Sequence, residues 1–70
     1  MSKRIIRLKE VIDKTSLSSA TIYRKMDSKS DLHDPEFPQK VSLGGRAVGW
    51  VESEVDEWIE RQISNARQSA

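Results

Sequence analysis

Two adjacent glycines, Gly44 and Gly45, separate two short runs in which apolar and polar residues alternate. The runs cover residues 40–43 and 46–51. Glycine tolerates the positive φ angles that a tight turn requires, so this pattern predicts a β-hairpin with the glycines at its tip. The fold of this chain must therefore combine a small hairpin with the helices that the remaining residues form.

A short helix is predicted near the N-terminus. Leu8, Val11 and Ile12 recur at the spacing of one helix face and indicate a helix over about 9–14. The run before it, 5–8, is short and contains β-branched residues, which indicates a brief strand leading into the helix.

The next segment predicts a second helix, from about Ser19 to Met26. Ser18 is the candidate N-cap, because its hydroxyl can accept a hydrogen bond from a backbone N–H that the helix leaves free. Ile22 and Met26 lie four residues apart and would face inward. Two short helices joined by a tight turn form a helix-turn-helix, whose second helix can enter the major groove of DNA.

A loop and a final helix are predicted in the second half of the chain. Residues 27–38 are turn formers with two prolines, and Phe37 is expected to anchor this loop in the core. A helix is expected to begin at Ser53, with Asp56 completing an approximate capping box. Its apolar stripe consists of Val55, Trp58, Ile59 and Ile63. Residues 65–70 have little to pack against and are expected to fray.

Length and composition narrow the class of protein. Seventy residues allow a single domain, 1–70, with order expected over about 4–64. The chain has no cysteine, and its one histidine, His33, has no second ligand nearby in sequence. The sequence shows no nucleophile–base pair, phosphate loop or metal-ligand set, which argues against an enzyme, a cofactor or a metal. No segment resembles a secretory signal or the roughly 20 apolar residues of a membrane span, so a cytoplasmic location is expected.

Some conspicuous residues have ordinary structural explanations. Trp50 lies in a predicted strand and Trp58 on an apolar stripe, so both are expected in the core. The acidic residues within 52–60 are explained by helix capping and a solvated helix face, since a helix N-terminus favours anions.

The net charge of +1 conceals an uneven distribution along the chain. Residues 1–30 carry eight basic against three acidic side chains, a net charge of +5, and residues 31–70 carry four against eight, a net charge of −4. The basic half is where a phosphate backbone would be attracted. A solvated surface of mixed charge is the alternative explanation of this asymmetry taken alone.

The side of the second helix opposite Ile22 and Met26 is predicted to face DNA. Arg24 can make a bidentate contact with guanine, and small residues at the start of the helix would let it lie close to base edges. Tyr23 is either a phosphate or base contact or a half-buried core residue. The predicted DNA-binding residues of this segment are Ser18, Ser19, Ala20, Thr21, Tyr23, Arg24 and Lys25.

The hairpin tip and the N-terminus supply further candidate contacts. The backbone N–H of Gly45 can come close to a neighbouring molecule, and Arg46 adds a cation directly after it, so the hairpin can act as a wing on a phosphate strand or in the minor groove. Arg4 and Arg7 are predicted to grip phosphates. On this hypothesis the helix reads bases, and the other basic residues hold the backbone.

Four stretches follow one another in the chain, over 6–11, 17–26, 37–50 and 54–59. The most specific begins with Phe-Pro at 37–38 and ends with Leu-Gly-Gly-Arg-Ala-Val-Gly-Trp at 43–50. In this order they resemble the AlpA family of phage and prophage transcriptional regulators, over about residues 4–63. That family is similar to MerR-like winged helix-turn-helix proteins and to phage excisionases.

The resemblance implies a mainly α fold with a small β-hairpin, a winged helix-turn-helix with its recognition helix at 18–26 and its wing at 44–46. It implies sequence-specific binding to double-stranded DNA that activates or represses a promoter, or alternatively directs a phage integrase toward excision. Family members reach Phe-Pro through a short linker with glycine just before the phenylalanine. Here residues 29–35 lengthen that linker, and Glu36 takes the glycine position.

The number of copies and the class of partner stay open at this point. A domain this small makes few DNA contacts, so a homodimer or a side-by-side assembly on repeated sites is expected. The alternative of another class is a protein-interaction module that binds its partner through the acidic C-terminal helix.

Overall fold

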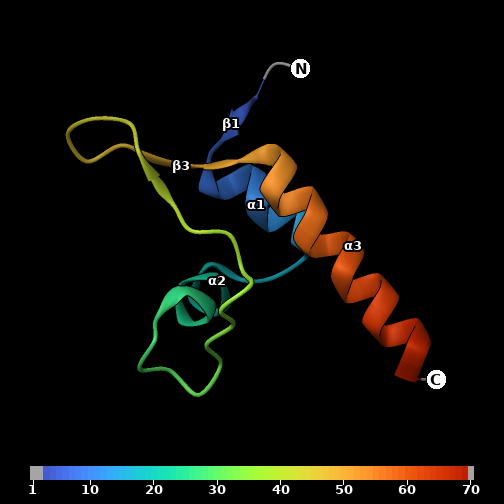
Figure 1. Ribbon diagram of the computed structural model, residues 1–70. Coiled ribbons are helices and arrows are strands. Elements are labelled where there is room, and N and C mark those ends of the chain that lie inside the picture. Colours follow the sequence, from blue (N-terminus) through green and yellow to red (C-terminus); the bar gives the residue numbers. More distant parts are fainter. Residues whose placement is uncertain (1–2, 70) are drawn as a thin grey trace.

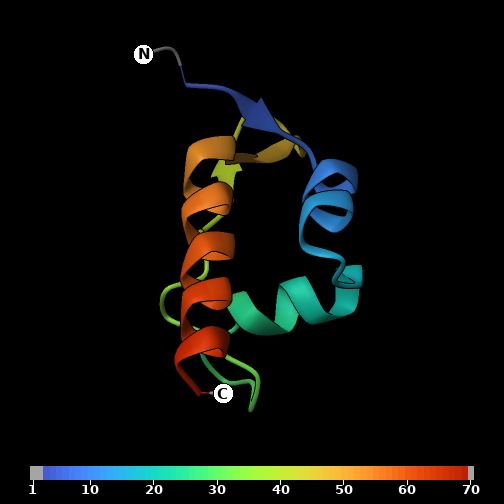
Figure 2. The same cartoon turned by 90° about the vertical axis from the view of Figure 1, so that its right-hand side faces the viewer.

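The structure, a computed structural model, describes residues 3–69 and shows a mainly helical fold with a small antiparallel sheet (Figure 1). Its elements are β1 (Ile5–Ile6), α1 (Leu8–Thr15), α2 (Ser19–Met26), β2 (Val41–Ser42), β3 (Val48–Val51) and α3 (Glu52–Ser69). Figure 2 shows α3 and α1 on opposite sides of the molecule, with α2 across one end and the sheet across the other. In the part of the chain that is described, no helix is both long and apolar enough to cross a membrane.

The predicted hairpin is present, and it is part of a larger sheet. β2 pairs with β3, and β1 pairs with the other edge of β3, which gives the strand order β1-β3-β2. Gly49 lies in the middle strand, where an added Cβ would overlap Ile5 Cγ2 and lie 3.0 Å from the backbone oxygen of Ile6. A glycine at this position therefore lets the side chain of Ile5 pack directly against the backbone of the central strand.

The core lies where the helices meet the inner face of the sheet. Its buried hydrophobic side chains are Ile6, Val11, Ile22, Phe37, Trp50, Val55 and Trp58. Phe37 packs edge-on against Trp58, with ring centroids 4.9 Å apart and an interplanar angle of 75°. The predictions that Phe37, Trp50 and Trp58 belong to the core are confirmed.

The turn between α1 and α2 is short because α1 ends on a left-handed residue. Ser16 has φ 62°, and its N–H donates to the carbonyl of Ile12 at 2.8 Å. The hydroxyl of Thr15 donates to the carbonyl of Val11, one turn earlier in the same helix, at 2.7 Å. Only 16–18 then separate the two helices.

The loop from α2 to β2 is held in place by Asp34. Its N–H donates to the carbonyl of Lys25, and its two carboxylate oxygens accept from the indole N–H of Trp58 and the backbone N–H of Glu36, all at 2.9 Å. Burial raises the pKa of this carboxyl, but the two hydrogen bonds, with the charges of Lys25 and His33, outweigh it and lower the pKa below 3.8. The lengthened linker is thus tied to both α2 and α3.

The last helix differs from the prediction at both ends. The N–H of Glu52 donates to the carbonyl of Arg4 at 2.8 Å, so β3 passes directly into α3 and Ser53 lies inside the helix instead of at its N-cap. The sequence predicts a frayed tail over 65–70, whereas α3 continues to Ser69, and Ala70 lies outside the described residues. Ala66, Arg67 and Gln68 are good helix formers, and the charge of Arg67 suits the C-terminal end.

Candidate nucleic-acid interface

The outward face of α2 carries most of the candidate contacts. Ile22, on the inner face, is fully buried, whereas Ser19, Ala20 and Arg24 are exposed on the other side. The first turn of α2 contains no acidic residue, and its last turn contains Arg24 and Lys25. The orientation expected from the helical periodicity is therefore the one observed, with a small, polar and basic side toward solvent.

The start of α2 is capped as the sequence predicts. The Ser18 hydroxyl accepts a hydrogen bond from the Thr21 N–H at 3.2 Å and donates one to Thr21 Oγ1 at 3.0 Å. Both hydroxyls are therefore committed to the cap, although the proton of the Thr21 hydroxyl is still free to be donated outward. Thr21 itself is half-buried, in contrast to its exposed neighbour Ala20.

Tyr23 is 42% exposed, and its ring contacts a basic side chain that the sequence did not predict to lie there. Lys40, in the segment just before β2, places its Nζ 5.8 Å from the centre of the Tyr23 ring. The charge count assigns Lys40 to the acidic half of the chain, and no local signal connects it with α2. Folding therefore adds a basic group beside the outward face of this helix.

Lys25 departs from the predicted surface. It is half-buried, and its Nζ lies 5.6 Å from the centre of the Trp58 ring on α3. Its charge also acts on Asp34, which helps to lower the pKa of that carboxyl. Lys25 thus points toward the loop and α3 because the ring of Trp58 and the carboxylate of Asp34 attract its ammonium group.

The hairpin tip projects from the sheet, and in Figure 1 it lies to the left of α3, as α2 does. Gly44 and Gly45 have φ angles of 101° and 54°, and a Cβ added at either would have no atom within 4 Å. The tip is closed by hydrogen bonds from Leu43 N–H to Ala47 O at 2.8 Å and from Ala47 N–H to Gly44 O at 3.0 Å. Arg46 is exposed beside these glycines.

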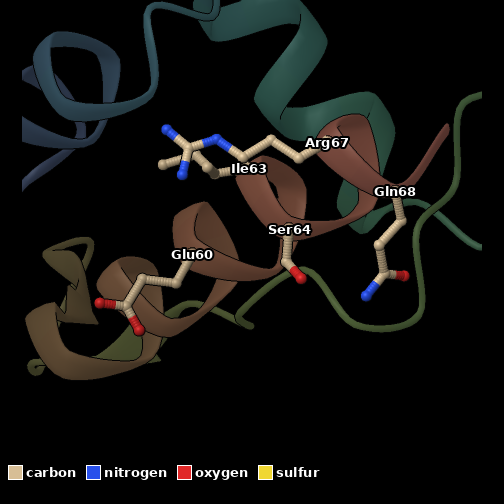
Figure 3. A pocket seen from close by; sticks show the side chains of 5 residues that line it. All are labelled: Glu60, Ile63, Ser64, Arg67 and Gln68. Carbon is tan, nitrogen blue, oxygen red and sulfur yellow. The ribbon is translucent and has the colours of Figure 1, made fainter. Parts of the chain in front are cut away.

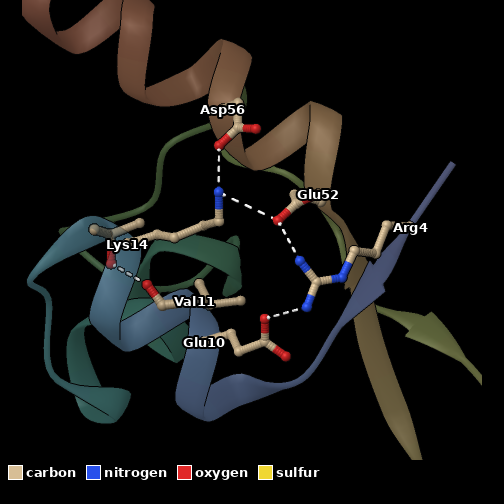
Figure 4. A network of polar contacts seen from close by, with 7 residues as sticks. Arg4, Glu10, Val11, Lys14, Glu52 and Asp56 are labelled. Atoms are coloured by element: carbon tan, nitrogen blue, oxygen red, sulfur yellow. Dashed lines mark hydrogen bonds and ion pairs between the residues drawn. The ribbon is translucent and has the colours of Figure 1, made fainter.

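The N-terminal arginines do not share one environment. Arg4 pairs with Glu10 at 3.1 Å and with Glu52 at 3.2 Å (Figure 4), whereas Arg7 is exposed at the N-cap of α1. Arg4 is therefore not the free cation that the charge distribution suggested. Its side chain nevertheless remains 63% exposed, and the two ion pairs use only two of the five N–H groups of its guanidinium.

The same network joins the basic and acidic halves of the chain. Lys14 on α1 binds Asp56 at 2.9 Å and Glu52 at 3.3 Å on α3. The hydrogen bond to Asp56 contributes most to raising the pKa of Lys14, against a smaller effect of desolvation. Part of the predicted charge asymmetry is thus cancelled inside the molecule, whereas the exposed Arg7, Arg24 and Arg46 take no part in this network.

The described residues, 3–69, contain no group of three or more His, Cys, Asp or Glu side chains that could hold a metal ion. The arrangement offers binding chemistry: guanidinium and ammonium groups, hydroxyls and the backbone N–H groups of a glycine-rich tip. These are the groups with which proteins contact phosphates and base edges.

Comparison with known proteins identifies the family of the chain. Residues 4–63 match the family described as prophage CP4-57 regulatory protein (AlpA). The chain belongs to this family. It is 48% identical over 59 residues to a protein of Escherichia coli (strain K12) named DNA-binding transcriptional activator AlpA, covering 84% of each chain. It is also 37% identical over 65 residues to the uncharacterized protein ORF88 of Enterobacteria phage P4, covering 93% of this chain and 67% of the phage protein. No solved structure matches the chain.

Proposed function

We propose that this protein is a sequence-specific DNA-binding transcriptional regulator of prophage type, acting on DNA in the cytoplasm. The observation that carries the proposal is the exposed, acid-free outer face of α2, which carries Arg24 in its last turn. The name of the Escherichia coli relative, a DNA-binding transcriptional activator, supports it. In this reading α1 and α2 form a helix-turn-helix, and the β2–β3 hairpin is its wing.

The outer face of α2 enters the major groove. Ser19 and Ala20 are small enough for the start of the helix to approach the base edges, and Arg24 reaches a guanine through two parallel hydrogen bonds. The free proton of the Thr21 hydroxyl and the Tyr23–Lys40 pair bind the phosphates on either side of the groove.

The wing contacts the DNA backbone or the adjacent minor groove. Arg46 supplies a cation, and the positive φ angles of the two glycines leave the backbone of the tip open to close approach. Arg7 adds a phosphate contact, and Arg4 adds one through guanidinium N–H groups that its ion pairs with Glu10 and Glu52 do not use. Lys25 is not part of this surface, because its ammonium lies against Trp58.

The test compares two arginine variants on two DNA duplexes. A binding site is first selected from random-sequence DNA, and anisotropy titrations then use that duplex and a scrambled one over a range of salt concentrations. Arg24→Ala should cost about 1–3 kcal/mol on the selected site and much less on the scrambled one, because it removes a base contact. Arg46→Ala should weaken both duplexes alike and reduce the salt slope by about 1, because it removes a phosphate contact.

Arg61→Ala serves as the control, since this arginine lies on α3 and pairs with Glu36. It should bind both duplexes as the unchanged protein does. If Arg24→Ala binds the selected site as tightly as the unchanged protein does, the assignment of α2 as the recognition helix is wrong. Loss of affinity in all three variants would mean that bulk charge alone governs binding.

A further inference from the structure

The last turns of α3 lie beyond the core of the protein. Among the described residues, apolar packing from this helix ends at Trp58 and Ile59, yet the helix continues to Ser69. Figure 1 shows this part projecting away from the other helices. Helices in proteins owe most of their stability to packing along one face, so the α3 extension, residues 60–69, is expected to gain from a partner that covers it.

One face of the α3 extension combines opposite charges with an exposed apolar side chain. Figure 3 shows Glu60, Ser64 and Gln68 following one another along the helix, with Ile63 and Arg67 beside them, around an open hollow. Ile63 is 45% exposed, although it belongs to the apolar stripe expected from the sequence. Residues spaced by three, four and seven positions share one helix face, so these side chains form a single surface.

This surface is complementary to itself when it is reversed. We propose that the α3 extension pairs with the α3 extension of a second copy in an antiparallel arrangement. A two-fold axis between positions 63 and 64 sets Glu60 opposite the partner's Arg67, and repeats that ion pair on the other side of the axis. The same axis sets the large Ile63 against the small Ser64 of the partner subunit.

Charge selects the antiparallel arrangement over the parallel one. A parallel pair would bring Glu60 beside its own copy and would align the acidic first turns of both helices, which contain Glu52 and Glu54. An antiparallel pair moves those turns to opposite ends of the interface and opposes the two helix dipoles. The attraction then comes from the two Glu60–Arg67 pairs and from the burial of Ile63.

The small size of the paired surface limits the affinity between two α3 extensions. It covers about two helix turns, well below the roughly 1,200 Å² that stable protein interfaces bury, and exposed ion pairs contribute little in water. Pairing is therefore weak in free solution. It becomes effective when two copies bind adjacent DNA sites, where the local concentration of the second copy is high. Only this last step rests on the proposed function.

Disulfide trapping tests the register directly, because the chain contains no cysteine. Ser64→Cys places its only thiol beside the two-fold axis and should form a disulfide-linked dimer under mild oxidation without DNA. Ser53→Cys is the control, since it lies on the same side of α3 but near the other end of the helix. This variant should remain monomeric if the pair is antiparallel and should form a disulfide-linked dimer if the pair is parallel. Efficient crosslinking of Ser53→Cys, or none of Ser64→Cys, would overturn the proposal.

Charge reversal supplies the second arm of the test. Glu60→Arg in the Ser64→Cys background should lower the crosslinking rate about tenfold, since two attractive pairs become repulsive. Adding Arg67→Glu reverses both charges and should restore the rate. A rate that stays low in the double reversal would refute the Glu60–Arg67 register. Because trapping needs no DNA, its failure would leave the assignment of α2 intact, and a failure of Arg24→Ala to weaken DNA binding would leave the pairing intact.

Discussion

Removing the carboxylate of Asp34 should destabilise the protein far more than removing another acid of the same loop. Asp34 accepts two hydrogen bonds through its side chain, from Trp58 Nε1 and from the N–H of Glu36, both at 2.9 Å. Trp58 is only 5% exposed, so water cannot readily replace the hydrogen bond from its indole N–H when the Asp34 carboxylate is removed. A hydrogen bond to a charged group contributes about 1.5–3 kcal/mol, and less where it is exposed, as with Glu36.

These values give the expected loss of stability. Asp34→Ala removes both hydrogen bonds and should lower the free energy of unfolding by about 2–3 kcal/mol, whereas Asp34→Asn keeps one acceptor oxygen and should lower it by about 1–1.5 kcal/mol. The free energy of unfolding of a 70-residue domain is roughly 4–10 kcal/mol, so either substitution should remove a large fraction of it. Urea denaturation followed by tryptophan fluorescence measures both values.

The matched control is Asp31→Asn, an exposed acid in the same loop, which should change stability by less than about 0.5 kcal/mol. A double-mutant cycle of Asp34→Asn with Trp58→Phe isolates the indole hydrogen bond and should give a coupling of about 1 kcal/mol. A coupling near zero, or equal losses for Asp34→Asn and Asp31→Asn, would refute the role given to this carboxylate.

The pH dependence follows from the same contacts. The pKa of Asp34 in the folded protein lies below 3.8, so its stabilising effect is complete above the pKa of the unfolded chain and is lost as the pH falls through the folded value. The difference in stability between the unchanged protein and Asp34→Asn should therefore be constant near neutral pH and shrink below about pH 4. A difference that grows on acidification would contradict the sign of this shift.

Two backbone substitutions test the local geometry by thermal or urea unfolding. Ser16→Gly should stabilise the protein by about 0.5–1 kcal/mol, because φ 62° strains a residue with a Cβ, and a destabilised variant would disprove the strain. Gly49→Ala should cost about 1–3 kcal/mol, since its Cβ would overlap Ile5 and crowd the Ile6 carbonyl. Ile5→Ala should recover part of that loss, and full stability of Gly49→Ala alone would contradict the close approach of β1.

Features that depend on near neighbours in the chain could be predicted from the sequence. The bounds of α2, its Ser18 cap, the Gly44–Gly45 tip and the burial of Phe37 follow from periodicity, hydrogen-bonding chemistry and backbone freedom within a few residues. The same reasoning identified the outward side of α2, because a helix that buries Ile22 must turn its opposite face to solvent.

Features that depend on residues far apart in the chain were decided by the tertiary structure. The pairing of β1 with β3, the hydrogen bond from Glu52 N–H to the Arg4 carbonyl, and the ion pairs Arg4–Glu52 and Lys14–Asp56 join residues 42 to 48 positions apart. Packing also turned Lys25 toward Trp58 and brought Lys40 beside Tyr23, which changed the membership of the basic surface. Charges act through space, so counting them along the chain gives their number, and only the fold decides which of them remain free to meet a partner.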